Sequence, residues 1–173
     1  MLNPDNYSAV ETLNSGRLLE IRAFKPHDRE EFLSAVGRTS VLSLYRRFFT
    51  VKQEFSEKEK AFFLNVDFNK QVALIALTDE AGRKAIVGGG RYVIVNPETA
   101  ELAFVVIDEY QGQGIGTVLL RHLAVIARAR GVQTLVADVL SENLPMLKVF
   151  QKSGLPMATS LGSEVVHVTF QLK

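Results

Sequence analysis

The stretch that decides the fold is "YQGQGIGTVLL", residues 110–120, in which Gly112, Gly114 and Gly116 stand directly before a run of good helix formers. The first amides of a helix have no partner within the helix, and the helix dipole places partial positive charge on them. Small residues at this point let an anion such as a phosphate approach the amides. A tight turn from a strand into a helix also needs glycines, so the pattern alone leaves both interpretations open.

The segments around this stretch predict a mixed sheet. Residues 1–17 read as an N-terminal arm or hairpin strand, and the apolar spacing favours helices within 27–49 and 56–66. The segments "QVALIALT", "AIVGGGRYVIV" and "AELAFVVI" then read as strands separated by turn residues. After the glycines the order is helix, strand, helix and last strand, with the two helices ending at Gly131 and Gly154. This order describes an α/β (α+β) domain.

Length and composition agree with a single domain over residues 1–173, since 47% hydrophobic residues can fill a sizeable core. The formal net charge is +1, and Lys and Arg form no basic stripe, which argues against a nucleic-acid partner. The polar N-terminus and the lack of a long apolar run predict a cytoplasmic protein without membrane contact. We expect no metal site, because the chain has no Cys and His27, His122 and His167 lack the spacing of metal ligands.

Two other phosphate-binding motifs fit the glycines poorly. The Walker pattern needs Gly-Lys-Ser or Gly-Lys-Thr, which does not occur in the sequence. The dinucleotide fingerprint is closer, because a helix and then a strand bearing Asp138 follow Gly112 and Gly114. Thr117, however, stands where its third small residue belongs, and "DEYQ" separates the strand from the glycines. We therefore disfavour both motifs.

A third pattern, Gln/Arg-x-x-Gly-x-Gly/Ala, is met at Gln111, Gly114 and Gly116 and resembles the acetyl-CoA loop of the GNAT superfamily of N-acetyltransferases. The resemblance continues through "TVLLRHLAVIARARGVQTLVADVLSENLPMLKVFQKSGL" and includes "IRAFKPHDREEF", so it covers nearly the whole chain. "SLYRRFF", "AELAFVVIDEYQGQGIG" and "ENLPMLKVFQKSGL" are most similar to the acetyltransferase domain of Pat-type protein lysine acetyltransferases. The resemblance implies a central mixed, mostly antiparallel sheet with helices on both faces and a splayed pair of central parallel strands.

The resemblance also implies the residues that bind acetyl-CoA. The backbone amides of the loop would hold the pyrophosphate, and the loop residues concerned are Gln111, Gly112, Gln113, Gly114, Ile115, Gly116 and Thr117. The backbone of Phe104, Val105 and Val106 would bond the pantetheine arm where the strand separates from its neighbour. Asn143 is either a contact of the cofactor or the N-cap of the helix that follows it, and one side chain can serve both purposes.

Glu101 is the candidate catalytic base. A carboxylate beside "LAFVVI" would lose part of its hydration, which would make it a better base, whereas a carboxylate at an exposed strand end would be inert. The resemblance favours the first interpretation, because GNAT enzymes that use a carboxylate base often carry it at this place on this strand. The usual general acid of the family, a Tyr seven residues after the Asn, is replaced here by Phe150.

Two further groups of residues have structural interpretations. Gly88, Gly89 and Gly90 lie inside a strand pattern, where they mark a bulge or a close approach of backbone rather than a second phosphate site. Tyr45, Phe48 and Phe49 are better explained as core residues than as a lid over the acceptor.

The sequence therefore predicts transfer of an acetyl group from acetyl-CoA to a primary amine by direct attack in a ternary complex. The favoured acceptor is a protein lysine, and a small-molecule amine is the alternative acceptor. A noncatalytic CoA-binding regulatory module is the alternative from another functional class. Phe150 supports this alternative, because it replaces the usual general acid of the family. The sequence leaves the oligomeric state open, with a homodimer as one arrangement to consider.

Overall fold

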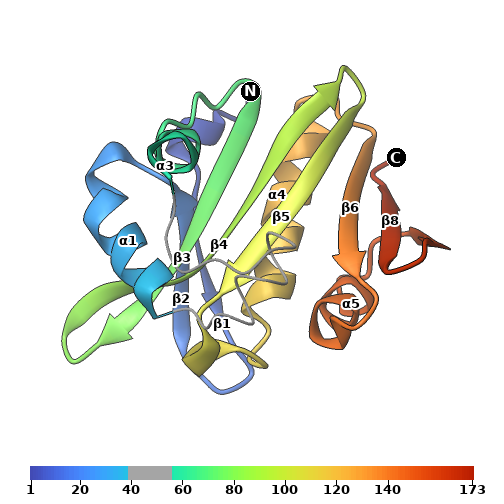
Figure 1. The fold of residues 1–173 in the computed structure, drawn as a ribbon. Helices are drawn as coiled ribbons and strands as arrows, with labels where there is room; N and C mark the ends of the chain where they lie inside the picture. Colours follow the sequence, from blue (N-terminus) through green and yellow to red (C-terminus); the bar gives the residue numbers. More distant parts are fainter. Residues whose placement is uncertain (39–55) are drawn as a thin grey trace.

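The structure is a computed structural model that describes residues 1–38 and 56–173. Its centre is one eight-stranded sheet with the strand order β1-β2-β3-β4-β5-β6-β8-β7 (Figure 1). Every neighbouring pair is antiparallel except β5 and β6, which run parallel. The strands are β1 (Ser8–Thr12), β2 (Leu18–Ala23), β3 (Gln71–Glu80), β4 (Arg83–Asn96), β5 (Thr99–Val106), β6 (Thr134–Leu140), β7 (Met157–Leu161) and β8 (Val165–Gln171).

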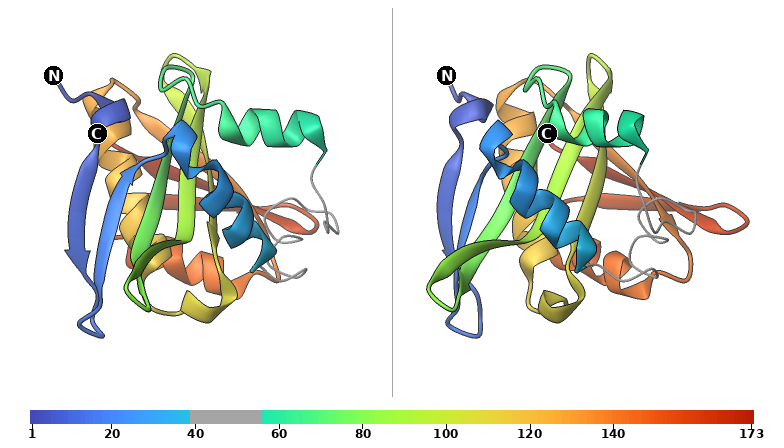
Figure 2. Two further views of the ribbon diagram at one scale, coloured as in Figure 1. Left: turned by 90° about the vertical axis from the view of Figure 1, so that its left-hand side faces the viewer. Right: turned by 60° about the vertical axis from the view of Figure 1, so that its left-hand side comes forward.

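Helices cover both faces of the sheet (Figure 2). The described α-helices are α1 (Arg29–Gly37), α3 (Glu57–Leu64), α4 (Ile115–Ala129) and α5 (Leu144–Lys152), and the short 3₁₀ helices are η1 (Pro4–Asn6), η2 (Pro26–Asp28) and η3 (Asp108–Tyr110). Helix α4 packs against β3, β4 and β5, and α1 lies against β4 from the opposite face. The predicted fold class is thus confirmed: a mixed, mostly antiparallel sheet with helices on both faces. Within the described residues, no helix combines the length and apolarity that crossing a bilayer requires.

The local predictions agree with the structure in most elements. Residues 8–23 form a β1–β2 hairpin, which gives the N-terminal arm its place at the edge of the sheet. The predicted helices before the first central strand correspond to α1 and α3. The helix predicted around "SLYRRFF", with Tyr45, Phe48 and Phe49, lies outside the described residues.

Strand β7 was missed at the sequence level. Its segment "MATSL" forms the outer edge of the sheet beyond β8, and most of its residues are exposed. An edge strand with few buried side chains has no alternation of apolar and polar residues, so the pattern that reveals a half-buried strand is absent. Pairing with β8, from Met157 opposite Phe170 to Leu161 opposite Val166, makes this segment a strand.

Helix α4 supplies most of the apolar surface that covers the centre of the sheet. Its Leu119, Leu123 and Ile126 are completely buried, which matches the predicted apolar face. The helix begins after Gly114, whose φ of +91° only glycine adopts easily, and stops at Gly131 with a φ of +86°. Glycines therefore define both ends of the helix that carries the phosphate-binding pattern.

The glycines of β4 allow neighbouring groups to approach the strand closely, as the sequence predicts. The register of β3 and β4 shifts beside Ala76, opposite Gly88, which marks an irregularity in the pairing. A Cβ atom at Gly90 would stand 2.7 Å and 2.9 Å from two ring carbons of Phe104 on β5. Gly90 thereby leaves room for the Phe104 ring between the sheet and α4.

We expect Gly90→Ala to lower the free energy of unfolding by about 1 to 3 kcal/mol, because the new methyl group overlaps the buried Phe104 ring. Gly89→Ala is the matched control, since its Cβ would meet only the Leu74 carbonyl oxygen at an ordinary 3.5 Å. Both changes restrict the unfolded chain equally, so the difference between their urea midpoints isolates the overlap. Equal midpoints would show that the Phe104 ring moves aside at no cost.

Candidate active site

The parallel strands β5 and β6 separate after three residues. Thr99, Ala100 and Glu101 pair with Thr134, Leu135 and Val136, and the described pairing ends there although both strands continue. The continuations diverge as two arms of a V (Figure 1). This splay agrees with the expected pair of central parallel strands, and it opens the sheet beside the loop that precedes α4.

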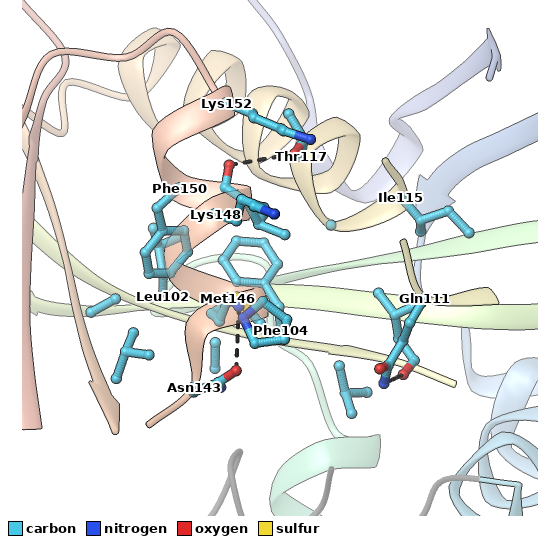
Figure 3. A pocket seen from close by; sticks show the side chains of 18 of the residues that line it. Leu102, Phe104, Gln111, Ile115, Thr117, Asn143, Met146, Lys148, Phe150 and Lys152 are labelled. Atoms are coloured by element: carbon cyan, nitrogen blue, oxygen red, sulfur yellow. Dashed lines mark hydrogen bonds between the residues drawn. The ribbon is translucent and has the colours of Figure 1, made fainter. Parts of the chain in front are cut away.

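A cleft of about 800 Å³ occupies the splay. Its lining comes from both diverging strands, from the glycine loop and from α5 (Figure 3). Eleven of the twelve predicted site residues line it: Glu101, Phe104, Val105, Val106, Gln111, Gly112, Gly114, Ile115, Gly116, Thr117 and Asn143. The twelfth, Gln113, is not among the described residues that line the cleft.

The glycine loop presents free amides to this cleft. The first hydrogen bond of α4 runs from the Val118 amide to the Gly114 carbonyl at 3.0 Å, so the amides of residues 115–117 precede it and have no helical acceptor. No atom lies within 4 Å of the position that a Cβ would take at Gly112 or Gly114, so the surface of the loop is open. The loop can therefore receive an anion at the positive end of α4.

Gln111 folds back onto the end of β5. Its side-chain amide donates to the Val106 carbonyl oxygen at 2.9 Å (Figure 3). This bond joins the first residue of the loop to the strand that forms one wall of the cleft. It also uses the Val106 carbonyl, one of the backbone groups predicted to bond a pantetheine arm.

Helix α5 closes the other side of the cleft. Asn143 is its N-cap and accepts a hydrogen bond from the Met146 amide at 3.3 Å, as one of the two sequence interpretations predicts. A Cβ at Gly116 would lie 3.2 Å from the Val149 side chain, so this glycine allows α4 and α5 to pack closely. The Thr117 hydroxyl adds a 3.4 Å bond to the Val149 carbonyl. The two helices thus hold the loop and the α5 N-terminus at one cleft.

Glu101 lines the cleft, but its side chain is exposed. It alternates with buried Ala100 and Leu102, which face α4, so its carboxylate lies on the opposite face of the sheet. The sequence-based expectation that the apolar neighbours of Glu101 remove part of the water around its carboxylate is therefore wrong. The apolar neighbours turn to the other face, and the carboxylate stays in contact with solvent.

Phe150 is part of an aromatic cluster under the cleft. Its ring is 2% exposed and packs edge-on against Phe104 and Phe170, with ring centroids 6.1 Å and 5.2 Å away. In this arrangement Phe150 is a residue of the hydrophobic core.

Four charged residues that line the cleft were not among the predicted site residues: Arg91, Asp138, Lys148 and Lys152. Lys148 and Lys152 project from successive turns of α5 toward the α4 side of the cleft (Figure 3). Asp138 of β6 also lines the cleft, and it forms an ion pair with His167 of β8. The i, i+4 spacing of the two lysines was a usable signal, but nothing in the sequence places that helix face beside the glycine loop.

The two sides of the cleft differ in the charged residues that they carry. Lys148 and Lys152 stand on α5, which packs with α4. Glu101 and Asp138 lie on the sheet face opposite α4, because Val136, the parallel partner of Glu101, and Asp138 share one face of β6. Arg91 of β4 shares that face, because it pairs with Ala103, two residues from Glu101, and its guanidinium donates to the Gln71 side chain at 3.2 Å. The α5 side of the cleft thus suits an anionic group, whereas the other side carries two carboxylates and one guanidinium.

Comparison with known proteins gives a family and several relatives. Residues 38–155 match the acetyltransferase (GNAT) family. Acetyltransferase PA5475 of Pseudomonas aeruginosa is 33% identical over 138 residues, which cover 79% of this chain and 74% of that protein. Acetyltransferase Pat of Mycolicibacterium smegmatis is 31% identical over 144 residues, which cover 82% of this chain but only 42% of that protein.

A solved structure is similar over nearly the whole chain. The GNAT domain of S. lividans PAT superposes with a TM-score of 0.85 at 31% sequence identity, covering 95% of this chain and 96% of that domain. The likeness therefore extends to the fold of nearly the whole chain.

Proposed function

Because the chain belongs to the acetyltransferase (GNAT) family and is an acyl-CoA-dependent N-acetyltransferase, we propose that it transfers the acetyl group of acetyl-CoA to a protein lysine in a ternary complex. The observation that carries the proposal is one cleft that joins an open helix N-terminus to an exposed carboxylate. The free amides of residues 115–117 and the two lysines of α5 lie on one side of this cleft. Glu101 lies on the sheet face that points away from α4.

The described residues fit acetyl-CoA. The amides of residues 115–117, at the start of α4, would bind the pyrophosphate, and Lys148 and Lys152 would add positive charge nearby. The separated strands β5 and β6 leave a gap for an extended pantetheine arm beside Phe104 and Val105. When bound, acetyl-CoA supplies a thioester whose carbonyl carbon accepts the amine.

Glu101 would act on the amine. The acceptor nitrogen loses a proton to Glu101, directly or through water, and forms a bond to the acetyl carbon, while the carbon–sulfur bond breaks and CoA leaves as a thiolate. The exposure of Glu101 suits this role, because an acceptor arriving from solvent can reach it. The positive N-terminus of α5, capped by Asn143, would stabilise negative charge that develops on the leaving group in this cleft.

The similarity to two Pat proteins supports a protein lysine as the proposed acceptor. The Pat acetyltransferase of M. smegmatis and the GNAT domain of S. lividans PAT resemble this chain over most of its length. The open position of Glu101 also leaves room for a side chain that is presented by a folded protein. A small-molecule amine is the competing acceptor.

Two assays test the proposal. Incubation with acetyl-CoA and a panel of amines should release free CoA thiol, whereas a noncatalytic CoA-binding module would bind the ligand and release none. Mass spectrometry of a cell extract treated with the enzyme and labelled acetyl-CoA should show a short list of lysine sites. Labelling of small metabolites alone would contradict the lysine proposal and leave the acetyltransferase activity standing.

Phe150→Tyr should raise the turnover number only slightly or leave it unchanged. A thiol with a pKa near 8.5 is a tolerable leaving group even as a thiolate, so a general acid adds little. The new hydroxyl would also be buried between Phe104 and Phe170, at a cost of about 1 to 3 kcal/mol in stability. The measurement is kcat at saturating acetyl-CoA, and an acceleration of about a hundredfold or more would show that a missing acid limits the enzyme.

A further inference from the structure

A polar network ties the glycine loop to a distant hairpin. Glu80, the last residue of β3, accepts a 2.6 Å hydrogen bond from the Tyr110 hydroxyl. Tyr110 is the last residue of η3 and directly precedes Gln111, the first residue of the loop. Tyr110 is 7% exposed and lines the cleft, so this bond connects the β3–β4 hairpin with the wall of the proposed acetyl-CoA site.

Arg38 and Arg17 hold the two partners of this bond in place. Arg38, just after α1, donates two bonds to the Glu80 carboxylate at 2.7 Å and 2.8 Å. Its guanidinium also pairs with Glu109 of η3 at 3.1 Å. The guanidinium of Arg17, in the β1–β2 turn, lies 5.1 Å from the centre of the Tyr110 ring. Four separate parts of the chain thereby meet at the residue before the loop.

The protonation states agree with this direction of bonding. The Arg38 guanidinium, and then the Tyr110 hydroxyl, lower the pKa of Glu80 to about 2, so Glu80 stays an ionised acceptor near neutral pH. Burial, and then the bond to Glu80, raise the pKa of Tyr110, so its hydroxyl keeps the proton that it donates. A charge-assisted bond of this kind is stronger and more directional than a neutral one.

We infer that Glu80, oriented by Arg38 and acting through Tyr110, is a positioning residue that holds the loop of residues 111–117 in the geometry that binds acetyl-CoA. The loop's own glycines cannot do this, because Gly112 and Gly114 lack side chains and have conformational freedom. The side chains of Gln111 and Thr117 hold the two ends of the loop, and Tyr110, which is buried and bonded directly before Gln111, adds an anchor at its start. The inference rests on the proposed acetyl-CoA site.

The test compares Tyr110→Phe, Glu80→Gln and the double variant by calorimetry with acetyl-CoA and by steady-state kinetics. Each single change should raise the acetyl-CoA Kd and KM about three- to tenfold with kcat little changed, since the network is partly exposed. The double variant should bind no more weakly than the weaker single variant, because Glu80→Gln weakens the same bond that Tyr110→Phe removes.

Tyr7→Phe is the matched control. It removes a tyrosine hydroxyl that bonds His122 of α4 at 2.5 Å, and neither Tyr7 nor His122 lines the cleft. Its acetyl-CoA Kd should equal that of the unmodified protein, even if its melting temperature falls as much as that of Tyr110→Phe. An unchanged Kd in Tyr110→Phe and Glu80→Gln, or an equal rise in Tyr7→Phe, would overturn the inference. Failure of the unmodified protein to bind acetyl-CoA would instead overturn the proposed function.

Discussion

Replacing Glu101 with glutamine is expected to lower the turnover number about a hundred- to ten-thousand-fold, with little change in the affinity for acetyl-CoA. A lysine amine with a pKa near 10.4 must lose a proton before it attacks at pH 7, a deficit of about three units or roughly 4 to 5 kcal/mol. Removal of this proton, which is the task of the base, is therefore the demanding part of the reaction. Glu101 stands where β5 and β6 separate, and its exposed side chain lines the cleft.

The pH dependence distinguishes a base from a mere strand-end carboxylate. Raising the pH deprotonates the free amine, so the lost rate of Glu101→Gln should be partly recovered in alkaline buffer. Glu98→Gln is the matched control, because Glu98 lies in the turn before β5, bonds the Gln133 side chain at 2.8 Å and does not line the cleft. Near-normal turnover and an unmoved pH profile in Glu101→Gln would show that Glu101 is not the base.

Replacing Gly114 with glutamate is expected to abolish binding of acetyl-CoA, with a loss of affinity of at least about a hundredfold. The new carboxylate would stand at the N-terminus of α4, where the proposed pyrophosphate lies, and like charges about 4 Å apart repel by about 4 kcal/mol near a protein surface. The measurement is calorimetric titration with acetyl-CoA. Unchanged affinity would remove the loop from the cofactor site.

Gly131→Glu is the control for backbone strain. Gly114 and Gly131 have φ values of +91° and +86°, and an added Cβ meets no atom within 4 Å at either position. Each substitution therefore costs about 1 to 2 kcal/mol of left-handed strain, at opposite ends of the same helix. We expect both variants to lose similar stability and only Gly114→Glu to lose acetyl-CoA. Equal loss of binding in both would mean that strain, and not charge in the loop, causes the effect.

The sequence by itself determined the elements whose causes are local. Glycines that adopt positive φ mark both ends of α4, and apolar residues at helical spacing form its buried face. Alternating or continuous apolar runs revealed the central strands, and the glycine motif together with the segments around it led to the family resemblance that named eleven of the residues lining the cleft. These signals are readable because each depends on residues only a few positions apart.

Only the tertiary structure showed how the predicted residues are arranged around the cleft and which further residues join them. The end of pairing after Glu101 and Val136 creates the cleft, and the alternation of β5 places Glu101 in solvent rather than among apolar neighbours. Lys148 reaches the cleft only because Gly116 lets α5 pack against α4, and Glu80 meets Tyr110 across 30 residues of chain. The strand "MATSL" exists because β8 lies beside it. Each of these outcomes depends on the packing of segments far apart in the chain, which no local pattern encodes.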